Sequence, residues 1–96
     1  MALPRFKTVH FNAAASVTQT LPELAVAVLN VQVITGTTTP SVTSDANYAV
    51  VTGTPSGAQA QFTGSVTAPS ATLTFPAPAL IVEDALVVQY VPVGWL

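Results

Sequence analysis

Apolar and polar side chains alternate along several short stretches of this chain, which is the pattern of β-strands that turn one face to a core. In the segment 6–11, Lys7, Val9 and Phe11 lie on one face. In the segment 71–75 the apolar residues recur at every second position, with Thr between them. Val, Thr and Ala dominate, while the strong helix formers Glu, Lys, Arg and Met are scarce. The composition therefore favours β-structure throughout.

The strongest strand pattern lies in Leu24 to Thr35, where valines recur at every second position. The phase of the repeat changes at Leu29 and Asn30, which indicates a bulge or a kink. We expect this segment to form the central strand. The alternative is a helix that begins at Pro22 with Thr20 as its cap, but the β-branched residues that follow argue against a long helix.

Turn-forming residues separate the remaining predicted strands. We expect a loop at 36–41 and turns at 44–47 and 53–57. Both faces of the segment 84–93 are largely apolar, which predicts that protein covers it on both sides, in the centre of a sandwich or at a subunit contact. The other predicted strands lie at 17–21, as a continuation of the first, and at 48–52, 58–63 and 71–75.

This pattern predicts an all-β fold, a single small β-sandwich or barrel of about six to seven strands. The length allows one domain over residues 1–96. We expect residues 1–15 to form an N-terminal arm and residues 94–96 a C-terminal tail.

Charged residues are few, and their scarcity excludes several classes of function. The 96 residues include two Lys or Arg and four Asp or Glu, whereas about a quarter of a typical soluble domain is charged. Arg5 and Lys7 are the only cations, so phosphate contacts cannot drive binding and we expect no nucleic acid partner. The chain contains no Cys, which removes disulfides and thiolate metal sites.

No segment has the pattern of a membrane span or an export signal. The longest apolar run, 24–34, contains Asn30 and Gln32 and has about half the length that a transmembrane helix needs. Polar residues interrupt the stretch that follows the N-terminal cations, so we predict no signal peptide. The expected partners therefore do not include a membrane.

The sequence offers little for catalysis or metal binding. His10 is the only His, and the segment 53–57 only superficially resembles the Gly-x-Ser-x-Gly nucleophile turn. We therefore predict no enzyme, no cofactor, no metal site and no small-molecule substrate. Four oxygen-bearing residues could in principle bind calcium, but their spacing fits no calcium loop, and roles in turns or as solvated acids explain them better. They are Asp45, Asn47, Glu83 and Asp84.

Aromatic and basic residues near the termini are the candidates for a protein interface. Trp95 is the only Trp and lies where one chain has little with which to cover it, and Trp is frequent at the energetic centres of interfaces. The alternative is that Trp95 folds back into its own core. Both cations and the only His lie in the first ten residues, so this segment could dock on an acidic surface. The candidate interface residues are Arg5, Phe6, Phe11, Tyr90 and Trp95.

The stretch from Ala46 to Val82 contains no charged residue. Exposed strand edges are normally protected from pairing by charged side chains. Here Pro and turns provide most of the protection, and edges this lightly protected are tolerable where an assembly covers them.

In these features the chain resembles the small β-rich structural proteins of tailed bacteriophage particles, particularly capsid decoration or cement proteins. The shared features are about a hundred residues, richness in Ala, Thr, Val, Pro and Gly, no Cys, an initial Met without an export signal, and an apolar last strand at 85–93. The resemblance implies a non-enzymatic virion protein that forms a homo-oligomer, often a trimer. It would bind the major capsid protein or another virion protein and stabilise the shell by bridging neighbouring subunits.

Such a protein would be assembled into the virion in the host cytoplasm and released by lysis. A tail or baseplate component fits the same features. Two other classes stay open. One is a subunit of a β-rich surface filament, with a terminus inserted as a strand in the next copy. The other is a carbohydrate-binding β-sandwich module, for which Tyr48, Tyr90 and Trp95 would be the exposed aromatic platform.

Overall fold

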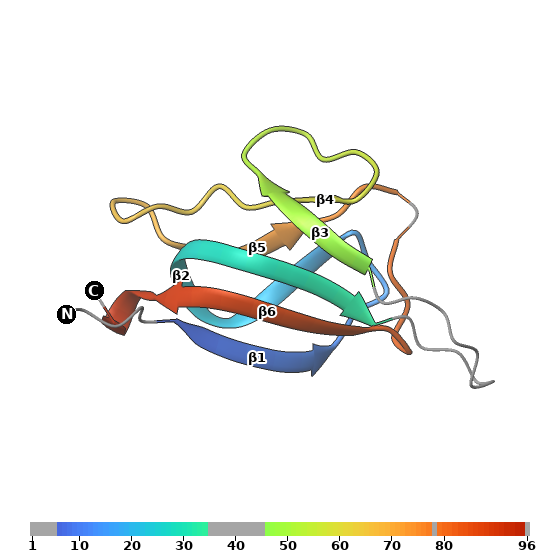
Figure 1. Ribbon diagram of the computed structural model, residues 1–96, viewed down its shortest axis with the longest axis horizontal. Helices are drawn as coiled ribbons and strands as arrows, with labels where there is room; N and C mark the ends of the chain where they lie inside the picture. The colour runs from blue at the N-terminus through green and yellow to red at the C-terminus, as the bar shows by residue number, and fades with distance from the viewer. Residues whose placement is uncertain (1–5, 35–45, 78, 96) are drawn as a thin grey trace.

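A computed structural model describes residues 6–34, 46–77 and 79–95, and it confirms the all-β prediction (Figure 1). The described residues form a small barrel-like fold of six strands that ends in a single 3₁₀ turn, η1. The elements are β1 (Lys7–Asn12), β2 (Thr18–Ile34), β3 (Ala46–Val51), β4 (Gln59–Gln61), β5 (Ser70–Thr74), β6 (Ala85–Pro92) and η1 (Val93–Trp95).

The long strand β2 takes part in both sides of the fold. Its first part pairs with β5, and its second part pairs with β6 on one side and β3 on the other. Strand β4 then joins β3 to β5, so the path from β2 through β3, β4 and β5 returns to β2. Strand β6 continues the sheet beyond β2, and β1 pairs with β6 as the last strand (Figure 1).

Strand β2 bends because its pairing shifts register in three places. One shift lies between Val28 and Asn30, which confirms the predicted irregularity there, since bulges bend a strand and increase its twist. The helix considered at Pro22 is wrong, because 18–34 is one continuous strand. Pro22 lies where the pairing with β5 is interrupted between Thr20 and Ala25, and such a position tolerates a residue without an N–H group.

The other strands lie within one or two residues of the predicted ones, with three differences. The segment 17–21 belongs to β2 and does not continue the first strand. The predicted turn at 44–47 is wrong at Ala46 and Asn47, which lie in β3, and residues 44–45 and the loop predicted at 36–41 lie outside the described residues. The segment 58–63 contains a strand of only three residues, β4. The segment expected as an N-terminal arm supplies β1 from Lys7 onward.

Alternating side chains from all six strands fill the core or pack against it, as the period-two patterns predicted. In β6 the inward residues are almost completely buried, while Val87, Gln89 and Val91 on the opposite face are half-buried. Val9 and Phe11 of β1 pack against the same core. The main core residues are Leu21, Val28, Val31, Val33, Ala60, Phe62, Leu73, Phe75, Leu86, Val88 and Tyr90.

Candidate functional site: a polar cluster and two uncharged surfaces

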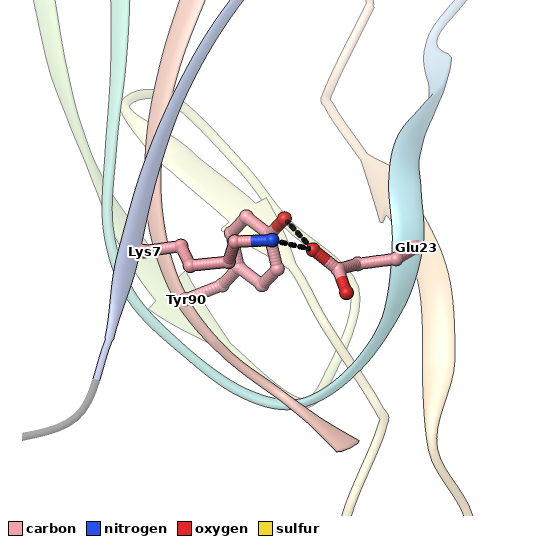
Figure 2. Close-up of polar contacts among 3 residues, drawn as sticks. All are labelled: Lys7, Glu23 and Tyr90. Carbon is pink, nitrogen blue, oxygen red and sulfur yellow. Dashed lines mark hydrogen bonds and ion pairs between the residues drawn. The ribbon is translucent and has the colours of Figure 1, made fainter. Parts of the chain in front are cut away.

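Three polar side chains meet at the end of the barrel where β1 begins and β6 ends. Lys7 and Tyr90 are paired across β1 and β6, and Glu23 reaches them from the first part of β2 (Figure 2). Nζ of Lys7 donates a hydrogen bond to Oε2 of Glu23 at 2.7 Å. The Tyr90 hydroxyl donates to the same oxygen, also at 2.7 Å. One carboxylate oxygen therefore joins three strands.

The cluster changes the acidity of two of its members. The hydrogen bond from Lys7, followed by that from Tyr90, lowers the pKa of Glu23 below its usual value. Burial raises the pKa of Tyr90 to about 12, and the hydrogen bond to Glu23 adds to this effect. Glu23 is therefore ionised and Tyr90 neutral around neutral pH. This arrangement favours a structural link over acid–base chemistry, which works best with a pKa near the operating pH.

The link acts where the sheet has no ladder. Among the described strands, β1 pairs only with β6, and the first part of β2 pairs only with β5. No backbone ladder therefore joins β1 to this part of β2, and the side chains of Lys7 and Glu23 connect them instead (Figure 2). Both side chains remain about 40% exposed, so water and salt weaken the ion pair.

An exposed apolar surface lies beside the cluster, and we call it the terminal patch: Leu24, Val93 and Trp95. Leu24 follows Glu23, and the pairing of Ala25 with Pro92 brings it toward η1. Leu24 is 53% exposed and Trp95 40% exposed. Nζ of Lys7 lies 5.8 Å from the centroid of the Trp95 ring, within the range of a cation–π contact. Trp95 thus keeps a large part of its surface open to a partner.

A second surface is the outer face of the sheet. It consists of the side chains of β1, β6 and β2 that point away from the core, and the pairing registers place them in continuous rows. None is a Lys, Arg, Asp or Glu residue. The members are Thr8, His10 and Asn12 of β1, Ala85, Val87, Gln89 and Val91 of β6, and Ala27, Asn30, Gln32 and Ile34 of β2.

The structure places three of the five candidate interface residues, Phe6, Tyr90 and Trp95, at the Lys7 end of the barrel. Tyr90 and Trp95 lie at the Lys7 end of the barrel, where Tyr90 is 1% exposed and contributes its ring to the core. Phe11 lies toward the other end of β1, paired with Leu86 and packed inward. Phe6 is half-buried just before β1. Arg5 lies outside the described residues.

Sequence reasoning missed Glu23 and Leu24 as members of this site. For Glu23 the sequence did contain a signal, because the chain has only four acids with which Lys7 could form an ion pair. The choice among them depends on the bend of β2, which brings together residues that are 16 positions apart. The exposure of Leu24 follows the alternation of β2, in which the even-numbered residues from Thr18 to Leu24 face outward, and the alternation breaks only afterwards, where Ala25 and Val26 are both buried.

Of the residues considered for calcium, Asp84 has a turn role, while Asn47 lies in β3 and Asp45 lies outside the described residues. The backbone N–H of Ile81 donates to Oδ2 of Asp84 at 3.2 Å, and the Asp84 N–H donates to the carbonyl of Ile81. No three His, Asp or Glu side chains in the described part of the chain are grouped so that they could hold a metal ion. Within the same residues, no helix has the length and hydrophobicity required to span a membrane.

Comparisons with known proteins identify no relative of this chain. No protein-family model matches the chain, and neither a curated protein nor a solved structure matches it.

Proposed function

We propose that this protein is a non-enzymatic assembly subunit that binds copies of itself and a larger particle, specifically a decoration protein of a bacteriophage capsid. The observation that carries the proposal is the uncharged outer face, together with the terminal patch at the end of the barrel. Surfaces with few charges and exposed large apolar side chains are typical of contacts between protein subunits. The virion role has a second support, which is the resemblance of the chain to capsid decoration proteins in length, composition and β-rich pattern.

The carbohydrate-binding alternative has less support. An aromatic platform needs several exposed rings. Tyr90 is buried, and Tyr48 makes an edge-to-face contact with Phe75, with ring centroids 5.1 Å apart. Trp95 is the one large exposed aromatic residue among the described residues.

Self-association is tested first by light scattering of the purified protein over a wide range of concentrations. We expect a defined oligomer whose fraction rises with concentration. A monomer at every concentration would contradict the self-assembly part of the proposal. Thr54→Lys adds a charge at an exposed position of the loop between β3 and β4, on the opposite side of the barrel from β1 (Figure 1), and we expect it to leave the oligomer intact.

The virion role needs a separate experiment. Lysates of cells that naturally produce the protein are separated on a density gradient, and each fraction is probed with an antibody against it. We expect the protein to sediment with intact particles and to be released from them by mild denaturant. Its presence only among slowly sedimenting proteins would overturn the virion role.

A further inference from the structure

Strand β1 has an open edge. Every other strand in the described part of the chain has a neighbour on both sides, whereas β1 pairs with β6 alone. In Figure 1, β1 forms the lower margin of the sheet. A strand with one neighbour leaves half of its backbone N–H and C=O groups without a ladder partner.

The pairing register identifies these groups. Antiparallel pairs alternate between residues that exchange backbone hydrogen bonds and residues that do not. The N–H of Ala13 donates to the carbonyl of Asp84 at 2.9 Å, and this pair continues the register of β1 with β6. Lys7, Val9 and Phe11 are therefore bonded to β6. The backbone groups of Thr8, His10 and Asn12 point to the open edge.

The open edge lacks the usual protection against pairing. Natural edge strands carry outward charges, Pro or a bulge. Strand β1 contains no Pro, its register with β6 is regular over all six residues, and its only charged residue is Lys7. The Lys7 side chain turns to Glu23 at the end of the barrel. The exposed side chains, Thr8, His10 and Asn12, carry neither carboxylates nor ammonium groups.

We propose that the open edge of β1 is the contact between two copies of this chain, which pair antiparallel about a two-fold axis at Val9. The proposal rests on the self-association in the proposed function and names its surface. Thr8 of one copy lies opposite His10 of the other, and Phe6 lies opposite Asn12. With two bonds for each such pair, the contact forms roughly eight backbone hydrogen bonds. The two sheets become one sheet with a continuous outer face.

A second copy fits this edge better than an unrelated strand because the edge is self-complementary. Residues opposite each other in an antiparallel pair point to the same face. The two-fold axis at Val9 sets Lys7 opposite Phe11 and Val9 opposite Val9, so the inward positions of β1 in both copies continue the inner face. The lysines of the two copies are not opposite each other, and neither are their histidines, which avoids direct repulsion between like charges.

The symmetry also decides the type of assembly. A two-fold contact uses the same surface on both copies and closes after two subunits. A strand exchanged head to tail would use two different surfaces and would propagate as a filament. The proposed contact therefore yields discrete dimers that larger assemblies can contain, and it separates this protein from the filament alternative.

The test uses amide hydrogen exchange of the wild-type protein, followed by nuclear magnetic resonance at low and high concentration. The amides of Thr8, His10 and Asn12 should exchange fast in the monomer and become protected, by about tenfold or more, as the dimer forms. The amides of Val9 and Phe11 serve as internal controls, because their bonds to β6 protect them at both concentrations.

A variant pair tests the backbone contact directly. His10→Pro removes an N–H group that β6 does not use, so the monomer should fold, and the dimer should dissociate about tenfold more readily or worse. His10→Thr keeps the N–H group and should retain the dimer that His10→Pro loses. Circular dichroism checks that both variants fold. If His10→Pro does not fold, the exchange experiment still decides the question.

The outcomes separate the two proposals. A dimer with protected Thr8, His10 and Asn12 amides supports the β1 contact. An oligomer of any size in which these amides stay unprotected overturns the β1 contact while the proposed self-assembly stands. A monomer at every concentration overturns both, and protection that appears only after a different protein is added assigns the edge to that partner.

Discussion

Gln19 shows how one side chain can determine the path of the backbone. It is 1% exposed, and its amide makes three hydrogen bonds with the bend that precedes β2. Its Oε1 accepts from the N–H of Ala14 at 2.7 Å, and its Nε2 donates to the carbonyls of Ala14 and Ser16. A buried polar side chain that satisfies three backbone groups stabilises a loop that no ladder holds.

We expect Gln19→Leu to lower the free energy of unfolding by roughly 1–3 kcal/mol, because the bend loses partners for backbone groups near a buried position. Urea denaturation measures the change. Thr20→Val alters the neighbouring exposed residue and should have little effect. A Gln19→Leu variant as stable as the wild type would mean that water replaces all three bonds.

The pair of Glu23 and Tyr90 gives stability a dependence on pH at both extremes. In the unfolded chain Tyr90 loses its proton near 10.0, and in the folded chain near 12. The free energy of unfolding should therefore fall as the pH rises from about 10 to about 12. The lowered pKa of Glu23 acts at the other end, where stability should fall as the pH drops below 4.5, the usual value of the group.

Tyrosinate absorbance measures the alkaline step. Tyr48→Phe leaves Tyr90 as the only tyrosine of the chain, and its titration midpoint should lie near 12. Adding Glu23→Gln should move the midpoint toward 10.0, the value of a free tyrosine, while burial keeps it from returning fully. A midpoint that does not respond to Glu23→Gln would contradict the hydrogen bond between these residues in solution.

At the level of elements, Gly64 marks the closest approach between the segment after β4 and the start of β5. A methyl group added at Gly64 would lie 2.5 Å from Cζ of Phe62 and 2.9 Å from the backbone N of Ser70. Phe62 is 4% exposed, so its ring has little room to move, and the backbone cannot move without disturbing β5. Only glycine fits this contact.

Gly64→Ala should therefore destabilise the protein by about 1–3 kcal/mol, the usual cost of overpacking. Thermal unfolding measures the effect. Gly53→Ala is the matched control, because nothing lies within 4 Å of its added methyl group, and it should be close to neutral. Replacing the ring by a smaller side chain, with Phe62→Leu in the Gly64→Ala background, should recover part of the lost stability. An unchanged melting temperature for Gly64→Ala alone would show that the ring moves aside.

The sequence predicted the elements well wherever side chains alternate without interruption. The outward Thr8, His10 and inward Val9 and Phe11 of β1 follow the expected faces, and so do Leu86, Val88 and Tyr90 of β6. It separated the strands predicted at 17–21 and from Leu24 onward, although they form one strand, because local propensity reads Pro22 as a break and cannot show that a register shift between β2 and β5 accepts a proline. The cluster around Glu23 depends on that same long-range pairing.

For the molecule as a whole, composition predicted the fold class and the scarcity of charge on the surface, but not which surfaces lie open. That depends on strand order, which several topologies satisfy equally from the sequence. The pairing of β1 with β6 alone exposes Thr8, His10 and Asn12 at an edge. The exposure of Trp95 likewise depends on the path of η1 after Pro92.

The pairing of the first strand with the last also shapes how the chain folds during its synthesis. Strand β1 leaves the ribosome early, yet its ladder partner β6 begins only at Ala85. Contacts between segments so distant in sequence form slowly, since a long loop must first be closed. Until then β1 has both edges unpaired, and the edge of β2 that pairs with β6 is open. Neighbouring nascent copies can meet in this state, so exchange of β1 between chains competes with correct closure, and a slower synthesis of the last strand should increase it.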